Sequence, residues 1–249
     1  MKFTFVCCWN NATQLETLLK PSLSILQKSG IDFNTLLIDT KAKGYHSAAE
    51  AFNKETKQMQ GELGDVLVFL HQDIAFDNAS LFQRIAVELQ REPNQILGVA
   101  GMPESSRTVS NLKYHATHQY ITRTQLTEKA EVCSLDECLV AISTSLFQKV
   151  RFDEKTCSGW HLYVVDLCYE ARRRFGTRSF VLPESIYHKA DGQEGLSCDN
   201  TFLSTMWRII KKYKTDYDSI YTPCYIVSTH FPASFIKLSR TFLKNLCHL

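Results

Sequence analysis

The sequence lacks the glycine-rich loops with which many nucleotide-binding α/β proteins hold phosphates. Its 249 residues include only 10 glycines, and none of these belongs to a G-x-G-x-x-G or G-x-x-x-x-G-K-[ST] pattern. A dinucleotide-dependent dehydrogenase and a P-loop enzyme are therefore disfavoured. If a diphosphate binds to this chain, we expect it to be held through a metal ion rather than through a glycine-rich backbone loop.

Other missing features disfavour disulfide-rich, membrane-spanning, secreted and nucleic-acid-binding proteins. None of the nine cysteines forms a C-x-x-C pair, and an odd number is a poor disulfide framework, so we expect free thiols in a reducing, cytoplasmic compartment. No apolar run is long enough to span a bilayer, and the start from Met1 to Val6 is too short for a secretory signal. The net charge of +2 gives no support to nucleic-acid binding.

Strand-like apolar runs alternate with amphipathic helical patterns through the first hundred residues. The runs expected to be strands are Phe3–Cys8, Thr35–Ile38, Val66–Leu70 and Ile96–Ala100. This order predicts an α/β fold in which helices flank a mostly parallel sheet. The loops that follow parallel strands gather at one edge of such a sheet, where ligands bind. Those loops carry Asn10, Asn11, Asp39, His71 and Asp73.

Two local signals refine the helices, and the second half of the chain is less regular. Thr13 and Glu16 are spaced as a capping box, and Pro21 predicts a kink or break. Further strands are expected at 138–142 and 179–182, and a helix at 162–175. A catalytic domain at 1–198 would be followed by a helical, basic extension at 199–249. Its amphipathic end, 235–249, either packs on its own domain or contacts an anionic membrane, at the inner face of the cell membrane.

The tripeptide His71-Gln72-Asp73 follows the most apolar of the predicted strands. A carboxylate at this position lies in the ligand crevice, where Mg²⁺ or Mn²⁺ can bind both the protein and a diphosphate. Such an ion neutralises charge on a departing diphosphate. Alternatively, Asp73 caps the helix or turn that follows.

Short pieces in a consistent order give the chain a resemblance to family 2-type glycosyltransferases of the GT-A fold, which is Rossmann-like. It is most similar to a bacterial branch whose aspartate motif reads H-Q-D. The pieces lie between residues 3 and 195. They are Cys8–Asn11, Asp39, the helix from His46 through Asn53, Val68–Asp73, Leu139–Ser143, Phe152–Glu154, Trp160–Cys168 and Ile186–His188. His71 stands where the family has the first aspartate of D-x-D, Asn11 where many members have glutamate, and the Glu-Asp pair before the base helix is absent.

The resemblance implies a role for each matching residue. Asp39 would bind the nucleoside, with Asn10, Asn11 and Asn53 lining its pocket. Asp73 would bind the metal and the diphosphate, His71 would lie beside it, and His188 would complete the metal site. Asp166 would be the general base that takes the proton from the acceptor hydroxyl. The donor would be a UDP-linked or other nucleotide-diphosphate sugar, and the acceptor a glycan or a lipid-linked molecule.

Each of these side chains also has an ordinary structural interpretation. Asp166 shares an otherwise apolar helix face with Leu162 and Tyr169, so it either opens onto a cavity or forms a salt bridge, for which Arg173 is the nearest candidate. Asp136 and Glu137 are the alternative bases. His188 is either a ligand or an exposed loop histidine. Trp160 either stacks on a sugar ring or belongs to the core.

These observations favour an inverting, metal-dependent glycosyltransferase of polysaccharide or glycoconjugate synthesis. The missing first aspartate and Glu-Asp pair leave a second interpretation open, a catalytically silent protein that binds nucleotide sugars or acts as a scaffold. A sugar nucleotidyltransferase is the third, although Trp9-Asn10-Asn11 lacks the glycine-rich basic loop that such enzymes have after the first strand.

Overall fold

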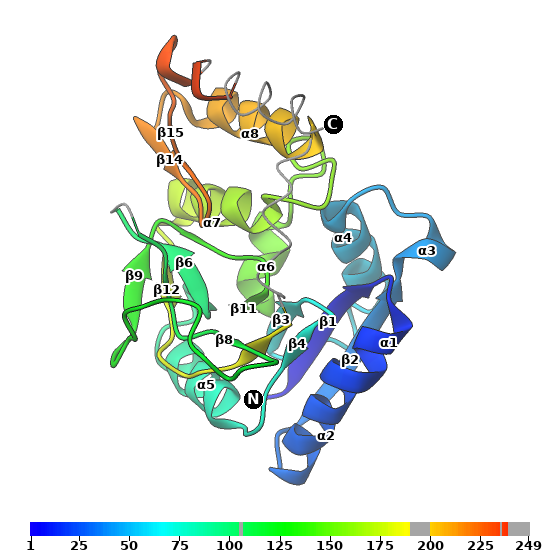
Figure 1. The fold of residues 1–249 in the computed structure, drawn as a ribbon. Helices are drawn as coiled ribbons and strands as arrows, with labels where there is room; N and C mark the ends of the chain where they lie inside the picture. The colour runs from blue at the N-terminus through cyan, green and yellow to red at the C-terminus, as the bar shows by residue number, and fades with distance from the viewer. Residues whose placement is uncertain (105–106, 190–199, 235, 239–249) are drawn as a thin grey trace.

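A computed structural model describes residues 1–104, 107–189, 200–234 and 236–238. Its centre is a seven-stranded sheet in the order β2-β1-β3-β11-β5-β12-β9 (Figure 1). The strands are β1 (Phe3–Trp9), β2 (Phe33–Asp39), β3 (Val66–Leu70), β5 (Gln95–Gly98), β9 (Ala130–Val132), β11 (Leu139–Ser143) and β12 (Arg178–Val181). All but β9 and β11 run in the same direction. The predicted α/β fold with a mostly parallel sheet is confirmed.

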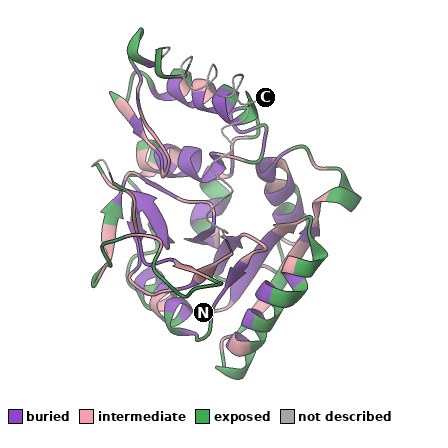
Figure 2. Ribbon diagram, viewed as in Figure 1, coloured by how far each residue is buried: buried purple, intermediate pink, exposed green. Residues whose placement is uncertain are grey.

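Helices cover both faces of this sheet. They are α1 (Ala12–Gln14), a π-helical turn (Leu15–Leu19), α2 (Lys20–Lys28), α3 (Thr40–Lys43), α4 (Ala48–Gln58), α5 (Ser80–Arg91), α6 (Thr144–Val150) and α7 (Tyr163–Phe175). Apolar residues of α2 and α5 form one core with the strand residues of one face, and those of α4, α6 and α7 form a second core on the other. The five residues of β3 are all buried, as expected of a central strand covered on both faces (Figure 2).

Three short sheets surround the large one. The first contains β4 (Ile74–Ala75), β8 (Lys113–Tyr114) and β13 (Tyr187–His188). The second contains β6 (Ala100–Met102), β7 (Val109–Ser110) and β10 (Ser134–Leu135). The third pairs β14 (Ser219–Tyr221) with β15 (Ile226–Ser228). The antiparallel pairing of β13 with β4 sets His188 opposite Ile74, next to Asp73 in the chain. This register joins a late segment of the sequence to the loop that follows β3.

One of the two local predictions for the first helical region is wrong. The helix begins before Thr13, and its cap is Asn11, whose side-chain oxygen accepts a hydrogen bond from the Gln14 N–H at 3.2 Å. At Pro21 the chain stays helical but is not a regular α-helix: α2 begins at Lys20, directly after the π-helical turn, and Pro21 lies in its first turn. The π-helical turn just before α2 keeps the chain helical across this junction.

The segment after residue 200 packs on the sheet-bearing part of the chain. Helix α8 (Asn200–Tyr213) and the β14–β15 hairpin form a third apolar cluster with Leu162, Val165 and Tyr169 from the start and middle of α7. The helical prediction holds for α8, whereas the hairpin was not expected. The boundary at 198/199 and most of the amphipathic stretch 235–249 lie outside the described residues. Among the described helices, none combines the length and the apolar character needed to cross a membrane.

Candidate active site

A cavity of about 410 Å³ opens at the edge of the sheet where β1, β2 and β3 end. Its volume is within the range of sites that bind small molecules and cofactors. Five segments line it: the three loops after these strands, the start of α4, and the turn before α7. The lining residues are Cys8, Trp9, Asn10, Thr40, Lys41, Tyr45, Ala48, Phe52, Leu70, His71, Gln72, Asp73, Trp160 and Tyr163. The lining therefore combines aromatic and apolar side chains with the polar residues of the loop after β3. Such a lining suits a ligand that has both a flat apolar part and a charged part.

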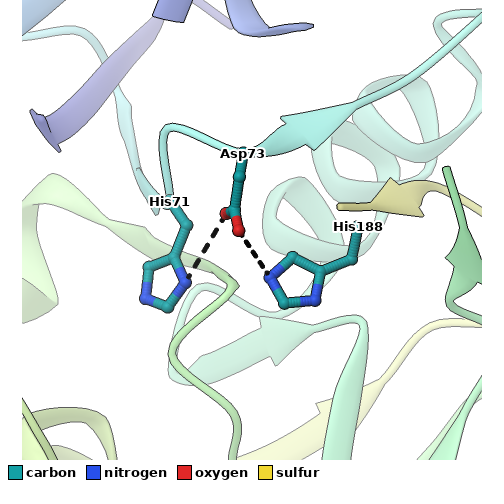
Figure 3. Close-up of side chains that lie close together, drawn as sticks. All are labelled: His71, Asp73 and His188. Carbon is teal, nitrogen blue, oxygen red and sulfur yellow. Dashed lines mark ion pairs between the residues drawn. The ribbon is translucent and has the colours of Figure 1, made fainter. Parts of the chain in front are cut away.

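His71, Asp73 and His188 bring their ligating atoms within 4.8 Å of one another (Figure 3). Nε2 of His188 lies 3.3 Å from Oδ2 of Asp73, and Nδ1 of His71 lies 4.0 Å from Oδ1. The backbone N–H of Lys189 donates to the Asp73 carbonyl at 3.1 Å, which fixes the strand carrying His188 against the loop carrying Asp73. Two imidazole nitrogens and a carboxylate therefore converge from two segments far apart in the sequence.

The charges in this cluster depend on one another. Burial alone would raise the pKa of Asp73, but the nearby imidazoles of His188 and His71 outweigh burial and hold that pKa below its usual value. Burial would lower the pKa of His188, but the Asp73 carboxylate has the larger effect and raises that pKa above its usual value. Asp73 Oδ1 and His188 Nε2 are both buried and have no hydrogen-bond partner. Buried polar atoms in native proteins are nearly always paired, so these two atoms suit a divalent cation.

Gln72 connects the loop that carries Asp73 to the loop after β1. Its side-chain oxygen accepts hydrogen bonds from the backbone N–H groups of Asn10 and Asn11, at 3.0 and 2.9 Å. Its side-chain nitrogen donates to Asn10 Oδ1 at 2.9 Å. Nothing in the sequence indicates this role, because it depends on the spatial distance between two loops more than sixty residues apart in the chain. The middle residue of the tripeptide thus positions one loop of the cavity relative to the other.

The sequence matches the profile of a family described as glycosyltransferase-like over residues 4–186, which is most of the chain. The chain belongs to the glycosyltransferase-like family. The family resemblance seen in the sequence is therefore confirmed. No protein of curated function matches this glycosyltransferase-like sequence.

Solved structures show that this glycosyltransferase-like chain has the GT-A fold. GalNAc-T7 with UDP, GalNAc and Mn²⁺ superposes with a TM-score of 0.54 at 11% identity, covering 85% of this chain and 48% of that chain. A mannosyltransferase from Pyrobaculum calidifontis with GDP-Man and Mn²⁺ gives 0.54 at 10%, covering 87% and 64%. Mannosyl-3-phosphoglycerate synthase from Rubrobacter xylanophilus gives 0.55 at 9%, covering 87% and 75%. The chain thus spans about half the length of GalNAc-T7 and under two thirds of the Pyrobaculum mannosyltransferase.

In the structure of this chain, the residues expected to bind the nucleotide sugar fall into two groups. Asn10, His71, Asp73 and Trp160 line the cavity, and Trp160 keeps 39% of its surface exposed. The other three, Asn11, Asp39 and Asn53, have structural hydrogen bonds. Asn11 caps α1, and Asp39 caps α3 by accepting from the N–H groups of residues 41 and 42.

Asn53 is held by the turn that follows α6. Its side-chain nitrogen donates to the Phe152 carbonyl at 2.8 Å and to Glu154 Oε1 at 2.9 Å, and its oxygen accepts from the Phe152 N–H at 3.2 Å. Both ends of the amide are therefore engaged. Asn53 is not among the described residues that line the cavity.

Asp166 points toward α8 and not into the cavity. The side chain of this expected base is buried, and its carboxylate accepts hydrogen bonds from Lys212 Nζ at 2.8 and 3.0 Å and from the Tyr213 hydroxyl at 2.9 Å. Burial raises the pKa of Asp166 to about 6, although Lys212 opposes that shift. This is the salt-bridged arrangement considered above, but the partner is Lys212; Arg173 pairs with Glu170 instead.

The alternative bases lie on the turn before β11, beside the loop that carries Asp73. The carbonyl of Cys138 in this turn accepts the His71 N–H at 3.0 Å, and Asp136 Oδ1 accepts the Cys138 N–H at 2.9 Å. Glu137 Oε1 is buried without a hydrogen-bond partner. Burial, reinforced by the Asp136 charge, raises the pKa of Glu137 well above its usual value.

Proposed function

We propose that this protein is a metal-dependent glycosyltransferase that moves a sugar from a nucleotide-diphosphate sugar, UDP-linked in the first instance, to an acceptor hydroxyl. The observation that supports this proposal best is the cluster of Asp73 with His188, in which a buried carboxylate oxygen and a buried imidazole nitrogen have no hydrogen-bond partner outside the cluster. Asp73 also lines the cavity into which Asn10 and Trp160 project. A cation held there would contact a ligand in the cavity directly.

The residues of the chain divide the work of the reaction. Asp73 and His188, with His71 beside them, would hold Mn²⁺ or Mg²⁺, which supplies Lewis-acid stabilisation of the departing nucleoside diphosphate. Asn10 lies at the polar end of the cavity, and Trp160 offers a flat apolar face to a sugar ring. Asp39, at the start of α3 next to the cavity residues Thr40 and Lys41, would bind the nucleoside.

An inverting displacement also needs a base for the acceptor hydroxyl. Asp166 has a pKa near the working range of a base, but Lys212 and Tyr213 occupy its carboxylate. Glu137 lies on the turn that contacts the metal-binding loop, and one of its oxygens has no hydrogen-bond partner. Glu137 thus remains an alternative to Asp166 as the base, and a Glu137→Gln variant that binds the nucleotide sugar but does not turn it over would support this role.

Two of the similar structures support the choice of ligands. GalNAc-T7 was solved with UDP, GalNAc and Mn²⁺, and the Pyrobaculum enzyme with GDP-Man and Mn²⁺. By analogy, the acceptor is a glycan or a lipid-linked glycan, as in polysaccharide or glycoconjugate synthesis. Membrane contact would come from 235–249, which lies mostly outside the described residues.

A binding panel tests the proposal. UDP- and GDP-sugars are added with and without Mn²⁺, and the midpoint of thermal unfolding is measured, because a ligand that binds only the native state stabilises it. We expect a Mn²⁺-dependent rise for at least one nucleotide sugar, lost in Asp73→Asn and His188→Ala. Asp218→Asn is the matched control, since that carboxylate is exposed on the C-terminal segment. A panel in which no nucleotide sugar raises the midpoint contradicts the proposal.

The second candidate function is nucleotide-sugar binding without turnover, which the ion-paired Asp166 favours. Release of free nucleoside diphosphate in the presence of Mn²⁺ distinguishes the two. A transferase shows at least slow hydrolysis of its donor, whereas a silent binding protein shows the thermal shift alone.

A further inference from the structure

The cavity wall that contains Trp160 is held from behind by helix α8. Trp160 belongs to the segment between α6 and α7 and lines the cavity with 39% of its surface exposed. On the cavity side, the carbonyl of Gly159 accepts the N–H of Ala48 at the start of α4, at 3.2 Å. The segment is anchored by this contact and by Cys157, which is fully buried in the core, and it receives further support from α8.

Arg208 of α8 supplies that support through its guanidinium group. Its Nε donates to the Thr156 carbonyl at 2.8 Å, and Nη2 donates to the Ser158 hydroxyl at 2.9 Å. A third bond, from Nη2 to Thr205 Oγ1 at 3.0 Å, fixes the group against its own helix. A planar guanidinium can make these bonds at once, whereas a lysine ammonium on a flexible stem cannot reproduce the geometry.

Two other residues on the same face of α8 contact this segment. Thr201 is so close to Gly159 that a Cβ added there would lie 2.3 Å from the Thr201 methyl carbon. Lys212 donates to Asp153 Oδ2 at 2.9 Å. Positions 201, 208 and 212 are seven and four residues apart, which is the spacing of one helical face. One face of α8 therefore contacts the segment from residue 153 to residue 159.

We propose that α8 is a positioning element of the active site, and that Arg208 holds Trp160 where it contacts the sugar of the donor. This inference rests on the proposed function. The helix lies beyond residues 4–186, which match the family profile, so the sugar-facing wall is completed by a part of the chain outside the family core. Arg208 is a positioning residue and touches no substrate.

The test compares Arg208→Lys with Lys211→Ala, an exposed position on the same helix. Affinity is measured by calorimetry, with Mn²⁺ present, for the nucleotide sugar that gives the largest thermal shift and for the matching nucleoside diphosphate. We expect Arg208→Lys to weaken binding of the nucleotide sugar roughly three- to tenfold, which is in the lower part of the range of coupling between contacting residues. The nucleoside diphosphate and Mn²⁺ should bind as in the wild type, and the Lys211 variant should be unchanged for all three.

A double-mutant cycle with Trp160→Ala shows whether Arg208 acts through Trp160. If it does, Arg208→Lys has no further effect on nucleotide-sugar affinity once Trp160 is removed. Ser158→Ala, which removes only the hydroxyl acceptor, should give a smaller effect of the same kind. Equal weakening of the nucleotide sugar and the nucleoside diphosphate, or additive effects in the cycle, would overturn the inference. Wild-type protein that binds no nucleotide sugar would instead overturn the proposed function.

Discussion

Replacing Lys212 by methionine should destabilise the fold far more than replacing its partner Asp166 by asparagine. The two side chains are 17% and 2% exposed, and their charged groups lie 2.8 Å apart. Removing one partner of a buried ion pair costs about 3–5 kcal/mol, because the other charge stays buried without compensation. We expect about 3 kcal/mol for Lys212→Met, since the Tyr213 hydroxyl still donates to Asp166 at 2.9 Å.

The asparagine variant differs because it removes the charge that burial penalises. Burial raises the pKa of Asp166 from 3.8 to about 6 in the folded protein. That rise of about two pKa units corresponds to about 3 kcal/mol of cost for the ionised form, at 1.36 kcal/mol per unit. This cost is what remains after the favourable contacts of Asp166 with Lys212 and Tyr213 are counted. Because Lys212 keeps Asp153 as a partner at 2.9 Å, Asp166→Asn loses this cost without leaving an unpaired charge. Its net effect at pH 7 should therefore be about 1 kcal/mol or less.

The assay is urea unfolding at pH 8 and pH 5, with the exposed Lys211→Met as control. Because the pKa of Asp166 is higher in the folded than in the unfolded state, the folded state binds more protons between about 6 and 3.8. The burial cost is fully present above this window and is relieved as the pH falls through it. The loss of unfolding free energy caused by Lys212→Met should therefore be smaller at pH 5 than at pH 8. An equal loss of unfolding free energy in the two variants, or a loss in Lys212→Met that does not change with pH, would refute the reasoning. Separately, loss of turnover in a stably folded Asp166→Asn variant would restore Asp166 as the base.

Four further predictions concern the metal, the loop contact and one glycine. His188→Ala should weaken Mn²⁺ binding by about tenfold or more, measured by calorimetry. Wild-type Mn²⁺ affinity should fall as the pH drops below neutrality, because the pKa of His188 is raised by Asp73 and protons compete with the ion for this nitrogen. Gln72→Ala, which frees the loop at Asn10, should weaken nucleotide-sugar binding by about tenfold with Mn²⁺ affinity retained, and unchanged nucleotide-sugar affinity would contradict the positioning role. Gly64→Ala should lower stability by about 1–3 kcal/mol in thermal unfolding, since its Cβ would lie 2.4 Å from the carbonyl oxygen of Lys2.

The elements that the sequence predicted well are those whose signal is local. The apolar run of β3 and the helical pattern of α7 each contain their own evidence, and both elements occur where expected. The position of β11 between β3 and β5 depends on pairing between distant segments, which periodicity does not reveal. The cap at Asn11 was missed for a related reason: Thr13 satisfied the spacing rule, but the end of β1 set the start of the helix two residues earlier.

The sequence predicted those parts of the site that follow from the topology of the sheet. His71 and Asp73 were placed at the cavity because they follow a central strand, while His188 came from the family resemblance alone. The partner of Asp166 was missed because the sequence offered Arg173 on the same helix, whereas Lys212 lies 46 residues further along the chain. The contacts of Gln72 were missed because an amide side chain carries no pattern of its own.

The floor of the cavity includes Cys8, and its surroundings bear on how the cleft can be labelled chemically. Burial, with a smaller contribution from Glu55, raises the pKa of this thiol to about 12. At neutral pH only about one molecule in 10⁵ then carries the reactive thiolate. Maleimides and acrylamide warheads should accordingly react with Cys8 far more slowly than with an ordinary surface cysteine, so covalent probes of this cleft need a different anchoring residue.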